Sequence, residues 1–516
     1  MDTESEREGV PNMLDVSVGK FTLESLTTGM YSDARIVFRE YIQNSVDSLE
    51  EAVQQQLLET TGMRIDIIVN EDKQYISVRD NGVGISAKIA EHTLLSIGNS
   101  QKRHTKNRGF RGIGRLGGMS YCDTLAFTTT CEGEPIATKI TFDCKKLREM
   151  LVPDDHEEHD LASVLSAVTS VEYFDDAESK HYFFVEMFDV DPLSGLLDID
   201  DIKDYISQVA PLPYRSRTFS RVLDIQRFAE NNGYTIEEFP VFLGERENDL
   251  EPLYKPNRNR FHSDRNKMKP DEILDVRYFT VSIKNTLCAI GWYGICNWFG
   301  MISESNICGL RVRKGNILIG DSRTLNPIFK ETRFNGWVQG EVFVLSDGLI
   351  PNARRDDFER NEIYFSFIDT LAAEVGQEIS GLIREASKRR NDPSGKALVA
   401  IQNQIFEAEI SLQDGFNSSV DKDRTLEELS RAEITLRSTS VTPAQQELKK
   451  ELARKIEETQ ESVASSRNYK INQVSSKLDR KSKKVLEIVS NILSKKLSKF
   501  LVDEIIDEIV DEFERK

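Results

Sequence analysis

The chain has 516 residues, enough for two to four domains with hydrophobic cores of their own. Apolar residues make up 39% of it and charged residues 30%, and no apolar run approaches the roughly 18 residues of a membrane span, so we expect a soluble, cytoplasmic protein without membrane attachment. The formal net charge of −19 argues against a protein whose whole surface binds nucleic acid, although a local basic groove stays compatible with it.

The cysteine spacing and the N-terminus both fit this class of protein. The six cysteines are scattered and show no C-x-x-C spacing, which favours reduced, mostly buried thiols over disulfides or a zinc site. The first ten residues are polar and lack the character of a signal peptide.

The segment 31–53 predicts an amphipathic helix. Asp33 is a candidate cap, and no Pro or Gly follows it in the segment. Apolar side chains recur at helical spacing and predict a buried stripe of Phe38, Ile42, Val46, Leu49 and Val53. Glu40, Asn44 and Asp47 recur on the opposite side, which taken alone predicts a solvated face. A carboxylate and a carboxamide one turn apart could also hold a water and a cation at a fixed separation.

Two glycine-containing motifs follow this helix. The alternating segments 64–69 and 75–79 predict a β-hairpin whose second strand runs into Asp80-Asn81-Gly82-Val83-Gly84. A tight turn explains the first three of these residues, and less readily the second glycine. Later, Gly109, Gly112 and Gly114 form a G-x-x-G-x-G pattern, which is either a flexible turn or a row of backbone N–H groups that face a phosphate.

The three motifs in this order resemble the GHKL ATPases, the superfamily of gyrase, the ninety-kilodalton heat-shock chaperones, histidine kinases and MutL. A leucine-containing segment and a Tyr31-Ser32 pair before the motif helix resemble the heat-shock protein 90-like (HtpG-type) ATPases of prokaryotes. The resemblance implies an N-terminal Bergerat-type ATP-binding α/β sandwich over residues 1–200, with ATP as ligand and Mg²⁺ as cofactor.

The resemblance also implies roles for single residues. Glu40 would be the general base, Asn44 the Mg²⁺ ligand, and Asp80 the acceptor for the adenine amino group. The other implied nucleotide contacts are Asp47, Gly82, Gly84, Ser100, Lys102, Gly109, Gly112, Ile113 and Gly114. The segment 96–108 resembles the family's lid, with a solvated surface loop as the alternative. The family usually places a Gly-Thr pair near the last strand of this domain, with the Thr on a phosphate; this chain has Ser179-Lys180-His181-Tyr182 there, so that role is not assigned.

Segments 123–130, 136–142 and 182–188 predict strands that complete an antiparallel sheet. We expect the acidic segment 153–160, with its two histidines, to be a solvated turn rather than a metal site. A second domain, predicted over 201–390, has strands at 310–314, 316–320 and 341–345, followed by Gly348–Glu359.

This succession resembles the middle α/β domain, of ribosomal-protein-S5-like type, of the heat-shock protein 90 chaperones. There an Asn and an Arg three residues later start a helix, and the Arg reaches the γ-phosphate of ATP. The match assigns that role to Arg355, with Arg354 as the neighbour that could be confused with it. The alternative is a cationic helix start paired with Asp356 and Asp357.

Residues 391–516 predict a helical C-terminal region, with breaks at 391–395 and near 438–443. Its last segment carries a long apolar stripe between Val485 and Phe513, basic before residue 500 and acidic after it. The stripe either docks on its own chain or dimerises, and the opposed charges of its two halves favour antiparallel dimerisation.

The sequence therefore predicts an α+β protein that acts as a slow, dimeric, ATP-driven clamp on a protein client or partner. The alternative is a DNA clamp like MutL or the MORC ATPases, with the basic segment Lys449–Lys499 as its DNA surface and a possible antiviral role. A histidine kinase is disfavoured because no histidine follows His262 and the ATP-binding motifs are N-terminal. A gyrase would need a cleavage domain that this length hardly accommodates.

Overall fold

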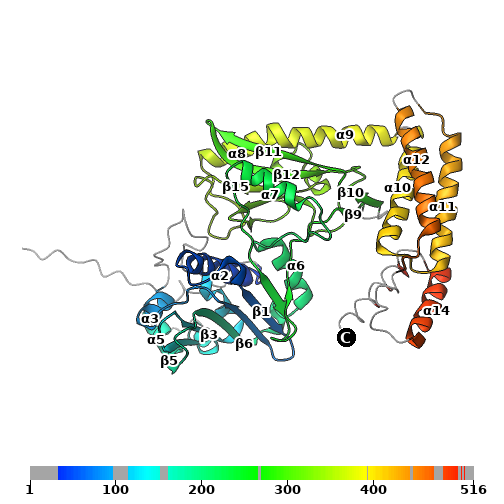
Figure 1. Ribbon diagram of the computed structural model, residues 1–516. Helices are drawn as coiled ribbons and strands as arrows, with labels where there is room; N and C mark the ends of the chain where they lie inside the picture. The colour runs from blue at the N-terminus through cyan, green and yellow to red at the C-terminus, as the bar shows by residue number, and fades with distance from the viewer. Residues whose placement is uncertain are drawn as a thin grey trace, which may run out of the picture.

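The computed structural model describes the chain in these ranges: 33–96, 114–151, 161–264, 269–391, 393–441, 445–469, 480–497, and the single positions 501, 502, 505 and 509. The chain forms three regions, each around a hydrophobic core (Figure 1). Among the described helices, none is long and apolar enough to cross a membrane.

The first region is built on a sheet that has, within the described ranges, eight strands in the order β5-β4-β3-β6-β2-β1-β7-β8. Neighbouring strands run antiparallel except β1 and β7, which pair in parallel. The strands are β1 (Ile65–Asn70), β2 (Tyr75–Asp80), β3 (Cys122–Thr130), β4 (Ile136–Asp143), β5 (Thr169–Asp175), β6 (Tyr182–Val190), β7 (Val241–Gly244) and β8 (Glu251–Pro252). The predicted hairpin is confirmed, as are the three further predicted strands.

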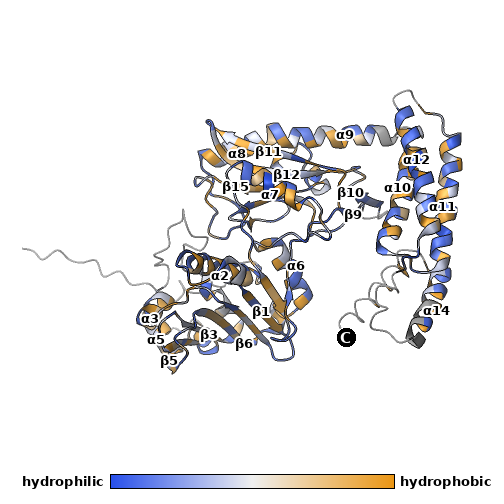
Figure 2. Ribbon diagram, in the orientation of Figure 1, coloured by the Kyte–Doolittle hydropathy of each residue, from blue (hydrophilic) through white to orange (hydrophobic). Residues whose placement is uncertain are grey.

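Helices cover one side of this sheet and contribute to the same core. They are α2 (Ile36–Gln54), α3 (Ala87–Leu95), α4 (Cys144–Leu151), α5 (Leu161–Val168) and α6 (Ile199–Val209), with short 3₁₀ turns η1 (Thr60–Gly62), η2 (Gly114–Ser120) and η3 (Pro192–Ser194). β1 is mostly apolar, as Figure 2 shows, because one of its faces and both of its edges are covered.

The motif helix α2 follows its prediction on one side and departs from it on the other. Phe38, Ile42, Val46 and Leu49 are fully buried, as the apolar stripe predicts. The expectation of a solvated opposite face is wrong, because Glu40 is only 9% exposed and is covered by the loop between residues 352 and 356. Asp33 also differs from its expected role, since its carboxylate accepts from the Arg35 amide, before the helix begins.

The second region has a five-stranded sheet, counted over the described ranges, in the order β11-β12-β15-β13-β14, and a separate pair of strands, β9 and β10. The elements are α7 (Val222–Asn231), β9 (Arg260–Ser263), β10 (Lys269–Glu272), β11 (Asp275–Ile283), β12 (Thr286–Ile295), β13 (Gly309–Lys314), β14 (Ile317–Ile319), η4 (Asn326–Ile328), η5 (Thr332–Trp337), β15 (Gln339–Val344), α8 (Glu362–Leu371), η6 (Ala372–Gly376) and α9 (Gln377–Asn391). The predicted strands at 310–314, 316–320 and 341–345 correspond to β13, β14 and β15.

The third region is helical, which together with the two sheets confirms the predicted α+β class. It contains α10 (Pro393–Asp414), α11 (Ser419–Ser438), α12 (Gln446–Ser465) and α14 (Arg480–Lys496). The first three helices share one core, and apolar and polar residues alternate around each of them in Figure 2, the pattern of amphipathic helices. The helix breaks fall where the sequence predicts them, after Asn391 and after Ser438.

The first two regions interleave along the chain. Residues as late as Leu253 pack in the first core, because β7 adds to the edge of the first sheet beside β1, whereas Tyr214 and Phe219 already belong to the second core. The predicted end of the first domain at residue 200 therefore falls before elements that still build its core. The domain ranges themselves stay predictions.

Candidate functional site

The polar face of α2 lines a cavity rather than bulk solvent. The cavity has a volume of about 200 Å³ and lies between α2, the turn after β2, α3 and the start of η2. The residues that line it are Asn44, Asp47, Ser48, Glu51, Asp80, Val83, Gly84, Ile85, Thr93, Leu94, Arg115 and Phe183. Four of the residues predicted from the sequence, Asn44, Asp47, Asp80 and Gly84, thus surround one hollow.

The turn after β2 is held against α2 by its glycines. Asp80 is almost fully buried, and its Oδ1 accepts the Gly82 amide at 2.9 Å. A Cβ atom on Gly82 would lie 2.1 Å from the Ser48 hydroxyl, so only glycine permits this approach to the helix. Gly84 has φ +67°, and a Cβ there would lie 1.9 Å from the Thr130 carbonyl oxygen. A simple hairpin turn does not require these close approaches of Gly82 to α2 and of Gly84 to β3.

The segment that replaces the family's Gly-Thr pair lies against this turn. The Nδ1 atom of His181 is 2.8 Å from the Gly82 carbonyl oxygen. The Thr129 hydroxyl accepts the Ile85 amide at 2.8 Å and donates to the Tyr182 carbonyl at 2.9 Å. Thr129 and His181 therefore fix the wall of the cavity. The sequence alone does not indicate these contacts, because β2, β3 and the start of β6 meet only in the folded sheet.

The last glycine of the G-x-x-G-x-G motif lies directly on Glu40. A Cβ atom on Gly114 would be 2.0 Å from Glu40 Oε2. The next residue, Arg115, lines the cavity and donates from its guanidinium to the carbonyl groups of Leu94 and Ser96, at 3.3 and 2.6 Å. Burial lowers the pKa of Arg115 to about 10. Arg115 is thus a cation of the site. The sequence motif does not indicate this role, because Arg115 only follows the last glycine of the motif.

A loop from the second region reaches Glu40 as well. Arg355 is 8% exposed, and its Nε lies 3.5 Å from Glu40 Oε1. Arg39, next to Glu40 on α2, donates from Nη2 to the Arg354 carbonyl at 2.9 Å. The Arg354 side chain is itself largely exposed and extends toward Asp356, at 3.9 Å. Of the two arginines that the sequence could confuse, Arg355 is the one that faces Glu40.

This loop differs from its expected conformation. No helix begins at Asn352 or Arg355: the chain makes a turn in which the Arg355 amide donates to the Asn352 carbonyl, and Arg355 has φ +56°. A bridge between Pro351 and Phe358 closes the loop, and α8 starts only at Glu362. The alternative of a cationic helix start is wrong for the same reason. It is the turn, and not a helix start, that projects Arg355 toward the first region.

The remaining predicted contacts Ser100, Lys102, Gly109, Gly112 and Ile113 lie outside the described residues, as does the acidic segment 153–160. For Mg²⁺ the donor chemistry fits: Asn44 places a carboxamide oxygen at the cavity, and Mg²⁺ in phosphate-transfer sites commonly uses few protein ligands, together with waters and phosphate oxygens. The part of the chain that the structure describes holds no cluster of three or more His, Cys, Asp or Glu suited to a metal ion.

Comparison with known proteins agrees with this geometry. Residues 31–169 match the family model described as histidine kinase-, DNA gyrase B-, and HSP90-like ATPase. The chaperone protein HtpG of Psychrobacter cryohalolentis is 30% identical over 131 residues, which correspond to 22% of this chain and 20% of the relative. The chain thus matches about a fifth of the length of that curated relative. The segment that matches the family model contains α2, the turn after β2, α3 and the start of η2, and thus all the residues that line the cavity except Phe183.

Proposed function

We propose that the chain is a Mg²⁺-dependent ATPase that works as a heat-shock protein 90-like conformational clamp. The premise is that residues 31–169 form an ATPase domain of the histidine kinase-, gyrase B- and HSP90-like family. The observation that carries this proposal is the approach of Arg355, from the second region, to Glu40 on α2. It supports a catalytic site composed of two regions, whose activity depends on how they are placed relative to each other.

In the proposed reaction, ATP lies in the cavity with its adenine at Asp80 and its phosphates toward Gly114. Glu40 acts as the general base that orients and deprotonates the attacking water. Mg²⁺, held by Asn44, supplies charge neutralisation on the phosphate oxygens when it is bound. Arg355 stabilises the charge that develops on the transferred phosphoryl group.

The contact between Arg355 and Glu40 also supports a dependence on the bound nucleotide. A guanidinium that pairs with the base competes with the water that the base must hold, whereas a γ-phosphate offers the same guanidinium a second anionic partner. In the proposed cycle Arg355 therefore moves from Glu40 to the γ-phosphate, and hydrolysis is slow because the two regions must adjust first.

We further propose that the clamp is a homodimer and that it acts on a protein client or partner subunit. The described part of α14 supports the dimer, since Val485, Ile488 and Ile492 are each at least 50% exposed on one helix. The second candidate function is a DNA clamp like MutL or the MORC ATPases. It requires the basic segment 449–499 to bind DNA, and salt-sensitive DNA binding that is lost on deletion of this segment would favour it.

The proposal is tested with the full chain by measuring ATP binding and ATP hydrolysis for the wild type, Glu40→Gln and Glu40→Ala. We expect slow hydrolysis by the wild type that stops when EDTA removes Mg²⁺, and ATP binding without hydrolysis for both variants. Asp80→Asn serves as the complementary variant, in which binding itself is lost. A wild-type chain that neither binds nor hydrolyses ATP would refute the proposed function.

A further inference from the structure

A second, larger cavity lies where the chain passes from the first region to the second. It has a volume of about 940 Å³ and is bounded by α6, the segment 214–218 and the segment 251–258. Its charged lining is basic apart from one glutamate, and consists of Lys203, Arg215, Arg217, Lys255, Arg258 and Glu251. We refer to it as the hinge groove. In a chain of net charge −19 such a lining is the opposite of the average surface.

The rim of the hinge groove presents cations that the protein itself does not neutralise. Glu251 lies 3.5 Å from Lys203, and so belongs to a single exposed pair. Arg215 and Arg217 are exposed, and neither forms an ion pair with a carboxylate of the described residues. These two guanidinium groups, which line one groove without a carboxylate partner among the described residues, are available for an anion from outside.

Beneath the hinge groove, a buried carboxylate is shared by two basic side chains. Lys255 is 2% exposed, and its Nζ lies 2.9 Å from Glu341 Oε2. Arg313 pairs with the same carboxylate, so two buried cations share it. The pKa of Lys255 is lowered to about 7, chiefly by burial and also by Arg313, while Glu341 opposes both effects. Glu238 also attracts Lys255, but burial raises the pKa of its own carboxyl group. The cations that an anion in the groove can reach are therefore the exposed arginines of the rim.

The uncharged lining suits a chain of phosphates that carries planar rings. Ser216 is exposed between the two arginines in sequence, and its hydroxyl can donate to a phosphate oxygen, whereas the Thr218 hydroxyl donates to the Arg215 carbonyl at 3.2 Å. Tyr254 is half-buried in the wall, and the Arg215 guanidinium carbon lies 5.6 Å from its ring centre. An aromatic ring beside a guanidinium is a surface on which an unpaired base can stack.

We propose that the hinge groove binds a single-stranded nucleic acid, with its phosphates on Arg215 and Arg217 and a base against Tyr254. An acidic peptide would use the cations, but it would leave the aromatic wall without a matching planar group. This site goes beyond the proposed clamp and does not depend on ATP hydrolysis. Its lining residues fall between 203 and 258, and so none of them belongs to the basic segment 449–499 that the sequence predicts as a DNA surface.

The test is fluorescence anisotropy of the full chain with labelled oligo-dT and oligo-U over a series of salt concentrations. We expect both strands to bind, with an affinity that falls linearly on a log–log plot against salt, by about 0.7 units for each neutralised phosphate. The ratio of the two affinities identifies DNA or RNA as the preferred source. Unlabelled polyglutamate should displace the strand poorly.

The variant Arg215→Glu/Arg217→Glu should weaken binding by about tenfold or more and flatten the salt dependence. Its control is Lys145→Glu/Lys146→Glu, which changes the net charge equally at exposed positions of α4 and should bind as the wild type does. Tyr254→Leu, which keeps all cations, should also weaken binding. Absence of binding at low salt, equal losses in both charge variants, or displacement by polyglutamate at equal charge concentration would overturn the proposal.

Discussion

At the scale of single residues, the site depends on how closely backbone can approach a carboxylate. Gly114 and Gly117 lie in the same 3₁₀ turn, but a Cβ atom at 114 would be 2.0 Å from Glu40 Oε2, whereas one at 117 would be 3.5 Å from a Val37 methyl group. Gly114→Ala should therefore displace Glu40 and lower the rate of ATP hydrolysis by at least about tenfold. Gly117→Ala is the matched control and should hydrolyse ATP as the wild type does; equal loss in both variants would contradict this account.

The turn after β2 makes a second prediction for single residues, in stability. Gly84 and Gly133 both have positive φ, at +67° and +84°, but only Gly84 lies against another backbone, with Thr130 O at 1.9 Å from an added Cβ. Gly133→Ala should cost about 1–2 kcal/mol, the strain of the left-handed conformation alone. Gly84→Ala should cost more, because the strand end must also move. Urea unfolding monitored by circular dichroism measures both, and equal costs would refute the close approach.

Which residues share the site is partly predictable from sequence. Glu40, Asn44 and Asp47 lie one turn apart on any helix, and Asp80 follows a strand, so their types and spacing are enough to indicate a pocket. Their burial is not predictable in this way. Glu40 is covered by Gly114 and Arg355, which are distant in sequence, and the periodicity of one helix cannot report what packs on its polar side.

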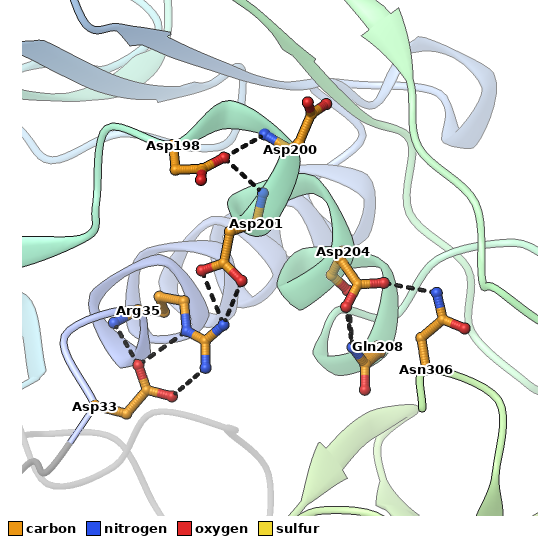
Figure 3. Close-up of polar contacts among 8 residues, drawn as sticks. All are labelled: Asp33, Arg35, Asp198, Asp200, Asp201, Asp204, Gln208 and Asn306. Atoms are coloured by element: carbon orange, nitrogen blue, oxygen red, sulfur yellow. Dashed lines mark hydrogen bonds and ion pairs between the residues drawn. The ribbon is translucent and has the colours of Figure 1, made fainter. Parts of the chain in front are cut away.

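At the scale of elements, α6 connects the two regions. Figure 3 shows the Asp201 carboxylate accepting two hydrogen bonds from Arg35, just before α2, both at 2.9 Å. On the same helix, Asp204 accepts from Asn306 of the second region at 2.6 Å. α6 thus contacts the start of the motif helix through one carboxylate and the second region through another. A movement of α6 would therefore change the position of the Arg355 loop relative to Glu40.

Asp204→Ala should therefore lower the rate of ATP hydrolysis several-fold while ATP affinity stays as in the wild type, since the substitution loosens the second region without touching the cavity. Asp200→Ala is the control: its carboxylate is drawn in Figure 3 without a contact to the other residues, and its position is exposed. Steady-state hydrolysis together with equilibrium ATP binding separates the two effects. A loss of affinity equal to the loss of rate would argue against this role of α6.

Helices and strands are predicted best where the hydrophobic pattern of a single segment is enough to identify them. The hairpin β1–β2 and the strands β3, β4 and β6 alternate or are continuously apolar, and the sequence predicts all of them. It does not predict β5 or β7: β5 is largely exposed, and β7 is a short strand that joins the first sheet from beyond α7. The helix expected at Asn352 is absent because the bridge from Pro351 to Phe358 closes the chain into a turn.

At the scale of the whole molecule, the proposed dimer makes a prediction for α14. Ile488→Asp/Ile492→Asp places charges on its exposed apolar face and should convert a dimer into a monomer in sedimentation velocity, because a desolvated carboxylate opposes association. Ile434→Asp, at an exposed isoleucine of α11, is the control and should leave the mass unchanged. A wild-type chain that sediments as a monomer at all concentrations would contradict the dimer.

The central claim for the whole molecule is that catalysis uses an arginine from the second region. Single-turnover ATP hydrolysis by Arg355→Ala, compared with Arg354→Ala, tests it most directly, because the two residues are neighbours and only Arg355 lies beside Glu40. We predict that Arg355→Ala binds ATP but hydrolyses it slower by on the order of 10³-fold, while Arg354→Ala stays near the wild-type rate. Wild-type hydrolysis by Arg355→Ala, or a loss confined to Arg354→Ala, would contradict the two-region site.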